Sequence, residues 1–199
     1  MEMAKISKRI SKRPVNLSLE ELASYVGNDG CSFCPAVFYN GERKSDAFNE
    51  MQVFALDFDS EVTFEIIRTR AEKYDLPIAF AYHTFSSTES LERFRVAFIH
   101  ECPVSNANAA KVILALLIEI FPDADGQCKD VSRMFLGGKG LIFFQEETFN
   151  IAGLALQYQK YEYITNYSNY SRRIKGFAKK EQSGLKWFVF SNRTRITTW

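Results

Sequence analysis

The sequence predicts an α+β fold whose core is a split βαβ unit, the ferredoxin-like or RRM-like arrangement, preceded by a smaller α/β elaboration. Two patterns carry this prediction. Residues 93–100 alternate strictly between apolar and polar side chains, which is the period of a half-buried strand, whereas residues 106–121 form a strongly apolar stretch of helical length that Pro122 closes. From Met51 onward the segments follow the order strand, helix, strand, strand, helix, strand, which is the order of that unit.

The N-terminal elaboration is predicted to contain a short helix and a strand. Ser18 belongs to the residue types favoured at an N-cap, so we expect a helix over residues 19–25 that Gly27 ends. Residues 35–39 are rich in strand-forming side chains and lead into the turn pair Asn40-Gly41. They are therefore expected to form a strand before a tight turn.

The core elements follow in order along the chain. They are a strand at 51–58, a helix at 61–74, a strand at 77–85, a polar turn at 86–92, a strand at 93–100, a helix at 106–121, a loop at 123–132, a short strand at 133–136 and an apolar stretch at 141–144. In the usual sheet of this unit the first strand lies between the third and the fourth and is antiparallel to both. The end of the first strand is therefore expected to meet the beginnings of the other two.

Asp57 and Asp59 end the apolar run of the first core strand. Side chains alternate between the two faces of a strand, so both carboxylates project to one side while Phe54, Leu56 and Phe58 point into the core. At a rise of about 3.3–3.4 Å per residue the two acids are about 7 Å apart, which suits a divalent ion that also binds phosphate oxygens. The pair indicates phosphoryl or nucleotidyl transfer, with a solvated strand end as the alternative.

The predicted topology brings charged residues from three distant segments to one open face at the end of this strand. The residues expected there are Asp57, Asp59, Arg93, Arg95, Asp125, Asp130 and Arg133. The carboxylates would hold one or two Mg²⁺ or Mn²⁺ ions, and the guanidinium groups would bind phosphate oxygens in bidentate fashion. The sequence does not decide which of Asp123, Asp125 and Asp130 supplies the third carboxylate.

Two more polar residues are candidates for nucleotide binding. Ser86 lies just before the third strand, and Lys139 lies in the turn at 137–140. Each of them either contacts phosphate or forms part of a turn.

Positive charge gathers at both ends of the chain, although the formal net charge is only +1. The tail at 151–199 contains several tyrosines, and aromatic rings beside cations suit base stacking and phosphate contact. Its candidate nucleic-acid-binding residues are Arg172, Arg173, Lys175, Lys179 and Lys180. Both ends are expected either to contact single-stranded DNA or to be solvated.

The four cysteines and the absence of a long apolar run bear on the cellular compartment. No stretch has the roughly 18 apolar residues that cross a bilayer, so no membrane partner is expected and a cytoplasmic protein is the simplest inference. Cys31 and Cys34 have the Cys-x-x-Cys spacing of half a zinc site, yet Cys102, Cys128 and the two histidines supply no matching second pair. The two interpretations are a zinc site and a buried structural pair.

Three segments together resemble the motifs of archaeo-eukaryotic primases. They are Asp57-Phe58-Asp59, Thr84–Ser87 with Arg93–Phe98, and Asp125–Arg133. The chain is most similar to the primase or primase-polymerase domains of replication proteins from plasmids, phages and integrated elements, over about residues 30–145. The resemblance implies a primase-like catalytic domain at 1–150 and a basic, tyrosine-rich extension at 151–199.

The resemblance also implies roles for single residues. The first motif of that family supplies two metal-binding acids and the third motif another, which correspond to Asp57, Asp59 and Asp125. The second motif often has a histidine that contacts nucleotide phosphate, and Arg95 occupies the matching place here. The implied activity is DNA-dependent joining of nucleoside triphosphates by a two-metal mechanism.

Several alternatives stay open. A catalytically silent replication-initiation module of the same fold would bind single-stranded DNA without copying it, and a nucleotide cyclase would use similar acids and metals. A phosphatase of the haloacid dehalogenase type is disfavoured, because Glu61 stands where Thr or Val is needed. No nucleotide-binding phosphate loop occurs, so a helicase is expected in trans or in a missing C-terminal domain.

Overall fold

The computed structural model describes residue 10 and residues 14–59, 61–161 and 194–198. Its strands and helices are β1 (Pro14–Leu17), α2 (Leu19–Gly27), β2 (Phe33–Cys34), β3 (Ala36–Phe38), β4 (Phe48–Phe58), α3 (Phe64–Lys73), β5 (Phe80–Thr84), β6 (Phe94–Val104), α4 (Ala107–Ile120), β7 (Gly138–Phe144), α5 (Ile151–Tyr161) and β8 (Thr194–Thr198). Short 3₁₀ helices are η1 (Tyr39–Gly41), η2 (Ser45–Ala47) and η3 (Gly126–Lys129). The α+β class predicted from the sequence is confirmed.

The main sheet has five antiparallel strands in the order β3-β4-β6-β5-β7. The predicted pairing of the first core strand with the third is confirmed by β4 and β6, but the predicted place of the fourth strand is wrong. β7 pairs with β5 at the far edge, and β3 takes the position beside β4. The connection between β3 and β4 spans only residues 39–47, so this pairing costs less loop-closure entropy than one with a strand far along the chain.

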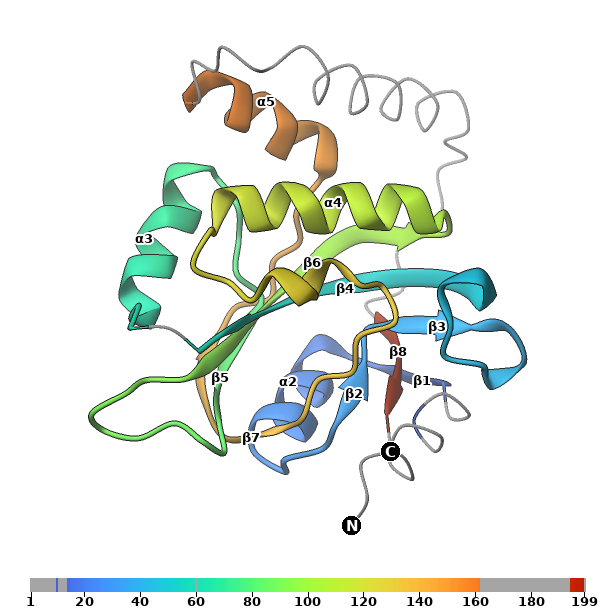
Figure 1. Cartoon of the computed structure of the whole chain (residues 1–199), viewed down its shortest axis with the longest axis horizontal. Helices are drawn as coiled ribbons and strands as arrows, with labels where there is room; N and C mark the ends of the chain where they lie inside the picture. The colour runs from blue at the N-terminus through green and yellow to red at the C-terminus, as the bar shows by residue number, and fades with distance from the viewer. Residues whose placement is uncertain (1–9, 11–13, 60, 162–193, 199) are drawn as a thin grey trace.

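Helices cover both faces of this sheet (Figure 1). Helices α3, α4 and α5 lie on one side, whereas α2 and a three-stranded sheet lie on the other. The smaller sheet has the antiparallel order β1-β8-β2, so residues 194–198 lie between two N-terminal strands. The domain boundary expected at residue 150 stays a prediction. The last described strand, β8, pairs with the N-terminal strands β1 and β2.

Local sequence signals explain where the helices begin. Ser18 Oγ accepts a hydrogen bond from the Glu21 N–H while the Glu21 carboxylate accepts one from the Ser18 N–H, which is a capping box. Asn106 Oδ1 caps α4 by accepting from the N–H groups of Asn108 and Ala109. The predicted helix starts at 19 and near 106 are therefore confirmed.

Aromatic side chains form much of the core between the main sheet and its helices. Phe58 stacks on Phe94 with ring centroids 5.0 Å apart, and Phe121, which ends α4, packs edge-on against Phe58 and stacks on Phe98. These rings are fully buried and hold the end of β4 against the start of β6. Such pairs add about 0.5–1.5 kcal/mol beyond the area they bury.

Residues 133–136, predicted as a strand, form only an isolated bridge. The N–H groups of Phe33 and Phe135 each donate to the other's carbonyl, at 2.9 and 2.8 Å, and the strand β7 begins later, at Gly138.

Among the helices that the structure describes, none combines the length and apolar composition needed to cross a bilayer.

Candidate functional site

Asp57 and Arg95 form a two-pronged ion pair across β4 and β6. The two residues are partners in the strand register, and Arg95 Nε and Nη2 lie 3.0 and 3.1 Å from Asp57 Oδ1 and Oδ2. The Asp57 side chain is only 4% exposed. A carboxylate removed from water needs such charge-assisted hydrogen bonds to remain ionised at low cost.

Arg133 joins this pair to the loop after α4. Its Nη2 lies 3.1 Å from Asp57 Oδ2 and 2.8 Å from Asp125 Oδ2, so one cation bridges two carboxylates. The Asp125 N–H also donates to the Asp57 carbonyl at 2.8 Å. The structure thus brings Asp57, Arg95, Asp125 and Arg133 together, as the sequence predicted.

The other candidate acids of the loop have different partners. Asp123 accepts a hydrogen bond from Arg70 Nη1 at 2.5 Å, and Asp130 accepts from the N–H and hydroxyl of Ser132. Of the three acids, Asp125 is therefore the one whose carboxylate shares Arg133 with Asp57.

Charge, burial and hydrogen bonding shift the pKa values of Asp125 and Arg133. Partial burial raises the pKa of Asp125, but the Gln127 N–H and the Arg133 guanidinium outweigh it, and the net pKa lies below the ordinary value. Burial lowers the pKa of Arg133, but the nearby Cys128 sulfur and the carboxylates of Asp125 and Asp57 outweigh it, and the net pKa lies above that of a free guanidinium. The ion pair between Asp125 and Arg133 therefore stays charged near neutral pH.

The segment after Asp130 closes the face that was expected to be open, so that expectation is wrong. Arg95 Nη1 and the Tyr82 hydroxyl both donate to the Leu136 carbonyl, at 2.6 and 3.1 Å. The guanidinium groups of Arg95 and Arg133 lie 5.9 and 5.4 Å from the centroid of the Phe135 ring. The segment that covers these charges has no regular secondary structure. The alternation of residues along a strand could therefore not predict that the face is covered.

Cys128 is a site residue that the sequence reasoning missed. Its Sγ accepts a hydrogen bond from the Asp57 N–H at 3.3 Å, and burial raises the pKa of this thiol to about 11. The thiol is therefore neutral and positions the backbone of Asp57. The available signal was its place between Asp125 and Arg133 in the third motif.

Four predicted residues lie outside the buried ion-pair network. Asp59 and Ser86 are exposed, and the Ser86 hydroxyl is 3.0 Å from that of Thr84. Lys139 Nζ donates to the Ser87 carbonyl. Arg93 is half-buried, and its buried Nε has no hydrogen-bond partner among the described residues.

The predicted set of three metal-binding carboxylates is not assembled. Within residue 10 and the ranges 14–59, 61–161 and 194–198, no group of three His, Cys, Asp or Glu side chains is placed to hold a metal ion. Two observations nevertheless fit a divalent ion: the donors of Asp57 and Asp125 are hard oxygens, and both already bind one shared cation, the Arg133 guanidinium. Mg²⁺ commonly binds one or two carboxylates together with substrate phosphates.

Two predicted sites remain, the Cys31/Cys34 pair and the basic residues of the tail. Cys34 is buried and its thiol donates to the Arg133 carbonyl at 3.3 Å, while Cys31 is half-buried. The candidate DNA-binding residues of the tail, Arg172, Arg173, Lys175, Lys179 and Lys180, lie outside the described residues.

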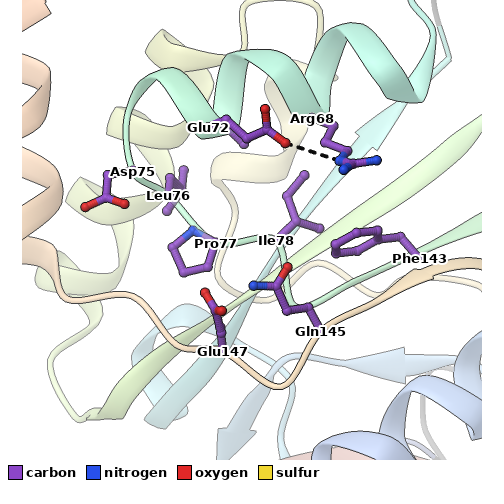
Figure 2. Close-up of a pocket in the computed structure, with 10 residues that line it drawn as sticks. Arg68, Glu72, Asp75, Leu76, Pro77, Ile78, Phe143, Gln145 and Glu147 are labelled. Carbon is purple, nitrogen blue, oxygen red and sulfur yellow. Dashed lines mark ion pairs between the residues drawn. The ribbon is translucent and has the colours of Figure 1, made fainter.

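A cavity of about 270 Å³ lies away from these charges, between α3 and the end of β7 (Figure 2). Its polar lining is mainly acidic, with Glu72, Asp75 and Glu147 around an apolar floor. Glu72 pairs with Arg68 at 3.3 Å. None of the residues predicted as catalytic lines it.

Comparisons with known proteins give one structural likeness. No protein-family model matches the chain, and no curated protein matches it either. A solved structure titled as the AEP domain (PP-N190) of the cyanophage S-2L primase-polymerase (PrimPol) is similar, with a TM-score of 0.43 and 13% sequence identity. The match covers 59% of this chain and 63% of that one, so the chain spans less than two thirds of that domain.

Proposed function

We propose that this protein is a primase-type nucleotidyltransferase that joins nucleoside triphosphates on a single-stranded DNA template. The observation that carries the proposal is the meeting of three distant segments in one network: Asp57 from β4, Arg95 from β6, and Asp125 with Arg133 from the loop after α4. Burying an ion pair seldom adds stability over apolar packing. A buried network of this kind is therefore better explained by function.

The chemistry follows from the residue types. Asp57, Asp59 and Asp125 would hold Mg²⁺ or Mn²⁺, which when bound neutralises phosphate charge and activates an attacking hydroxyl. Arg95 and Arg133 orient phosphate oxygens through their planar donor groups. Ser86 in the turn after β5, Arg93 just before β6 and Lys139 on β7 would supply further donors.

The resemblance in sequence extends the proposal to a biological setting. It suggests replication of a plasmid, phage or integrated element, with a helicase supplied by another chain or by a further domain.

The test is incorporation of labelled ribo- and deoxynucleoside triphosphates on single-stranded DNA, with and without a primer, in Mg²⁺ and in Mn²⁺. Asp59→Ala is the sharpest variant, because Asp59 is exposed and its loss leaves the buried ion pairs intact. We expect at least a roughly hundredfold loss of incorporation, whereas Glu65→Ala on the exposed face of α3 keeps full activity. Equal activity of Asp59→Ala and the unmutated protein would refute the proposed role of Asp59.

The occupation of the Asp57 carboxylate by arginine side chains favours a second candidate function. Both oxygens of Asp57 accept hydrogen bonds from guanidinium groups, as expected of a silent module that binds DNA without copying it. Such a module would show no incorporation with either metal. It would still bind single-stranded DNA with an affinity that falls steeply as salt rises.

A further inference from the structure

A second cavity lies directly beside the ion-pair network. Its volume is about 490 Å³, which is within the range of small-ligand sites. The lining residues are Arg43, Gln127, Lys129, Asp130, Arg133 and Met134. Three of these six side chains are cationic, and one of them, Arg133, also contacts Asp57 and Asp125.

The hydrogen bonds around this cavity favour an anionic occupant. Asp130 is its one acidic lining residue, and the Ser132 N–H and hydroxyl both donate to the Asp130 carboxylate. Arg43 Nη1 donates to the Ser132 carbonyl and so fixes the β3–β4 connection against the loop. The two sides of the cavity are therefore held together before any ligand binds.

Two other cavities in the described part of the chain have the opposite charge. The cavity in Figure 2 is lined by Glu72, Asp75 and Glu147 with Arg68 as its cation. A cavity of about 600 Å³ near the start of α3 contains Glu61, Glu89 and Glu92. Neither suits phosphate, because the carboxylates would repel it.

We infer that the cavity lined by Arg43, Lys129 and Arg133 binds a phosphate group and thereby releases the carboxylates of Asp57 and Asp125 from Arg133. A phosphate is a strong bidentate acceptor for guanidinium, so it competes with the two carboxylates for the same Nη2. The phosphate belongs either to a nucleoside triphosphate or to the DNA backbone. The release of carboxylates for metal rests on the proposed function, whereas the binding of phosphate does not.

The test measures binding of inorganic triphosphate to the full chain in EDTA, where metal plays no part. Lys129→Gln is expected to weaken binding by about tenfold, because it removes one charge-assisted contact. Gln127→Lys adds a cation to the same lining and is expected to strengthen binding, a gain that misfolding does not produce. Lys44→Gln is the matched control, because Lys44 is an exposed cation next to Arg43 that does not line the cavity.

A second arm identifies the source of the phosphate. The same variants are titrated with single-stranded DNA that lacks a terminal phosphate. Parallel changes for DNA and inorganic triphosphate assign the cavity to the DNA backbone, and changes for triphosphate alone assign it to the nucleotide. If neither Lys129→Gln nor Gln127→Lys differs from Lys44→Gln with either ligand, the inference is overturned, even where incorporation is intact. If binding responds as expected but the chain incorporates no nucleotide, the proposed function fails and the phosphate site stands.

Discussion

Asp57 and Asp125 are joined through both backbone and side chain. The Asp125 N–H donates to the Asp57 carbonyl at 2.8 Å, and Oδ2 atoms of both residues lie within 3.1 Å of Arg133 Nη2. The loop after α4 is thereby fixed to the end of β4.

The two arginines that pair with Asp57 are expected to differ in their contribution to stability. Arg95→Met removes both prongs of the pair and leaves Asp57 with one partner, so we expect a loss of about 3–5 kcal/mol in the free energy of unfolding. Arg133→Met leaves the two-pronged pair intact, and we expect about 1–2 kcal/mol. Urea unfolding of both variants measures the difference. An equal or larger loss for Arg133→Met would contradict the assignment of Arg95 as the main partner.

The titration of Asp125 reports its contact with Arg133. The pKa of Asp125 is depressed in the folded protein, so its stabilising contribution is present above the unfolded value, near 3.8, and is lost as the pH falls through the lower folded value. Arg133→Gln is expected to raise the pKa of Asp125 while the Gln127 N–H still holds it down. Carbon NMR of the Asp125 carboxyl measures this shift. An unchanged pKa in the variant would mean that the ion pair is not formed in solution.

The raised pKa of Cys128 is expected to lower the free energy of unfolding at alkaline pH. Burial raises the pKa of its thiol from 9.0 in the unfolded chain to about 11 in the folded one. The folded state therefore holds the proton more tightly, and its advantage, about 2–3 kcal/mol at most, is lost as the pH rises from 9 to 11.

Cys128→Ser isolates this effect, because a hydroxyl still accepts the Asp57 N–H but does not titrate in this range. Unfolding free energies of the two proteins, measured at intervals between pH 8 and 11, should converge as the pH rises. A constant difference would contradict a raised thiol pKa.

Residue 137, next to the site, has no room for a side chain. A Cβ at this position would lie 2.1 Å from the Gly30 carbonyl carbon and 2.3 Å from its oxygen, so backbone must move. Gly137→Ala is expected to lower the free energy of unfolding by more than about 2 kcal/mol. Gly140→Ala is the control in the same segment, because a Cβ there meets nothing within 4 Å. Similar melting temperatures for the two variants would show that residues 30 and 137 are not in close contact.

Local pattern was enough for most elements of the fold and for part of the site. The alternation around Arg95, the cap at Ser18 and the apolar run before Asp57 each depend on neighbours in sequence, and each was predicted correctly. The strand-end position of Asp57 and the pairing of β4 with β6 followed from the order of elements. These features are decided by short-range sterics and by which face a residue presents.

Tertiary structure alone decided how the charges are used. The sequence could place Asp57 and Arg133 near one another, but not show that one guanidinium would bridge Asp57 to Asp125, nor that the segment ending at Leu136 would bury the pair. It also placed a fourth core strand beside the first, at the position that the nearby β3 takes beside β4. Contacts of this kind join residues far apart in the chain and depend on long-range packing and desolvation, which no local period encodes.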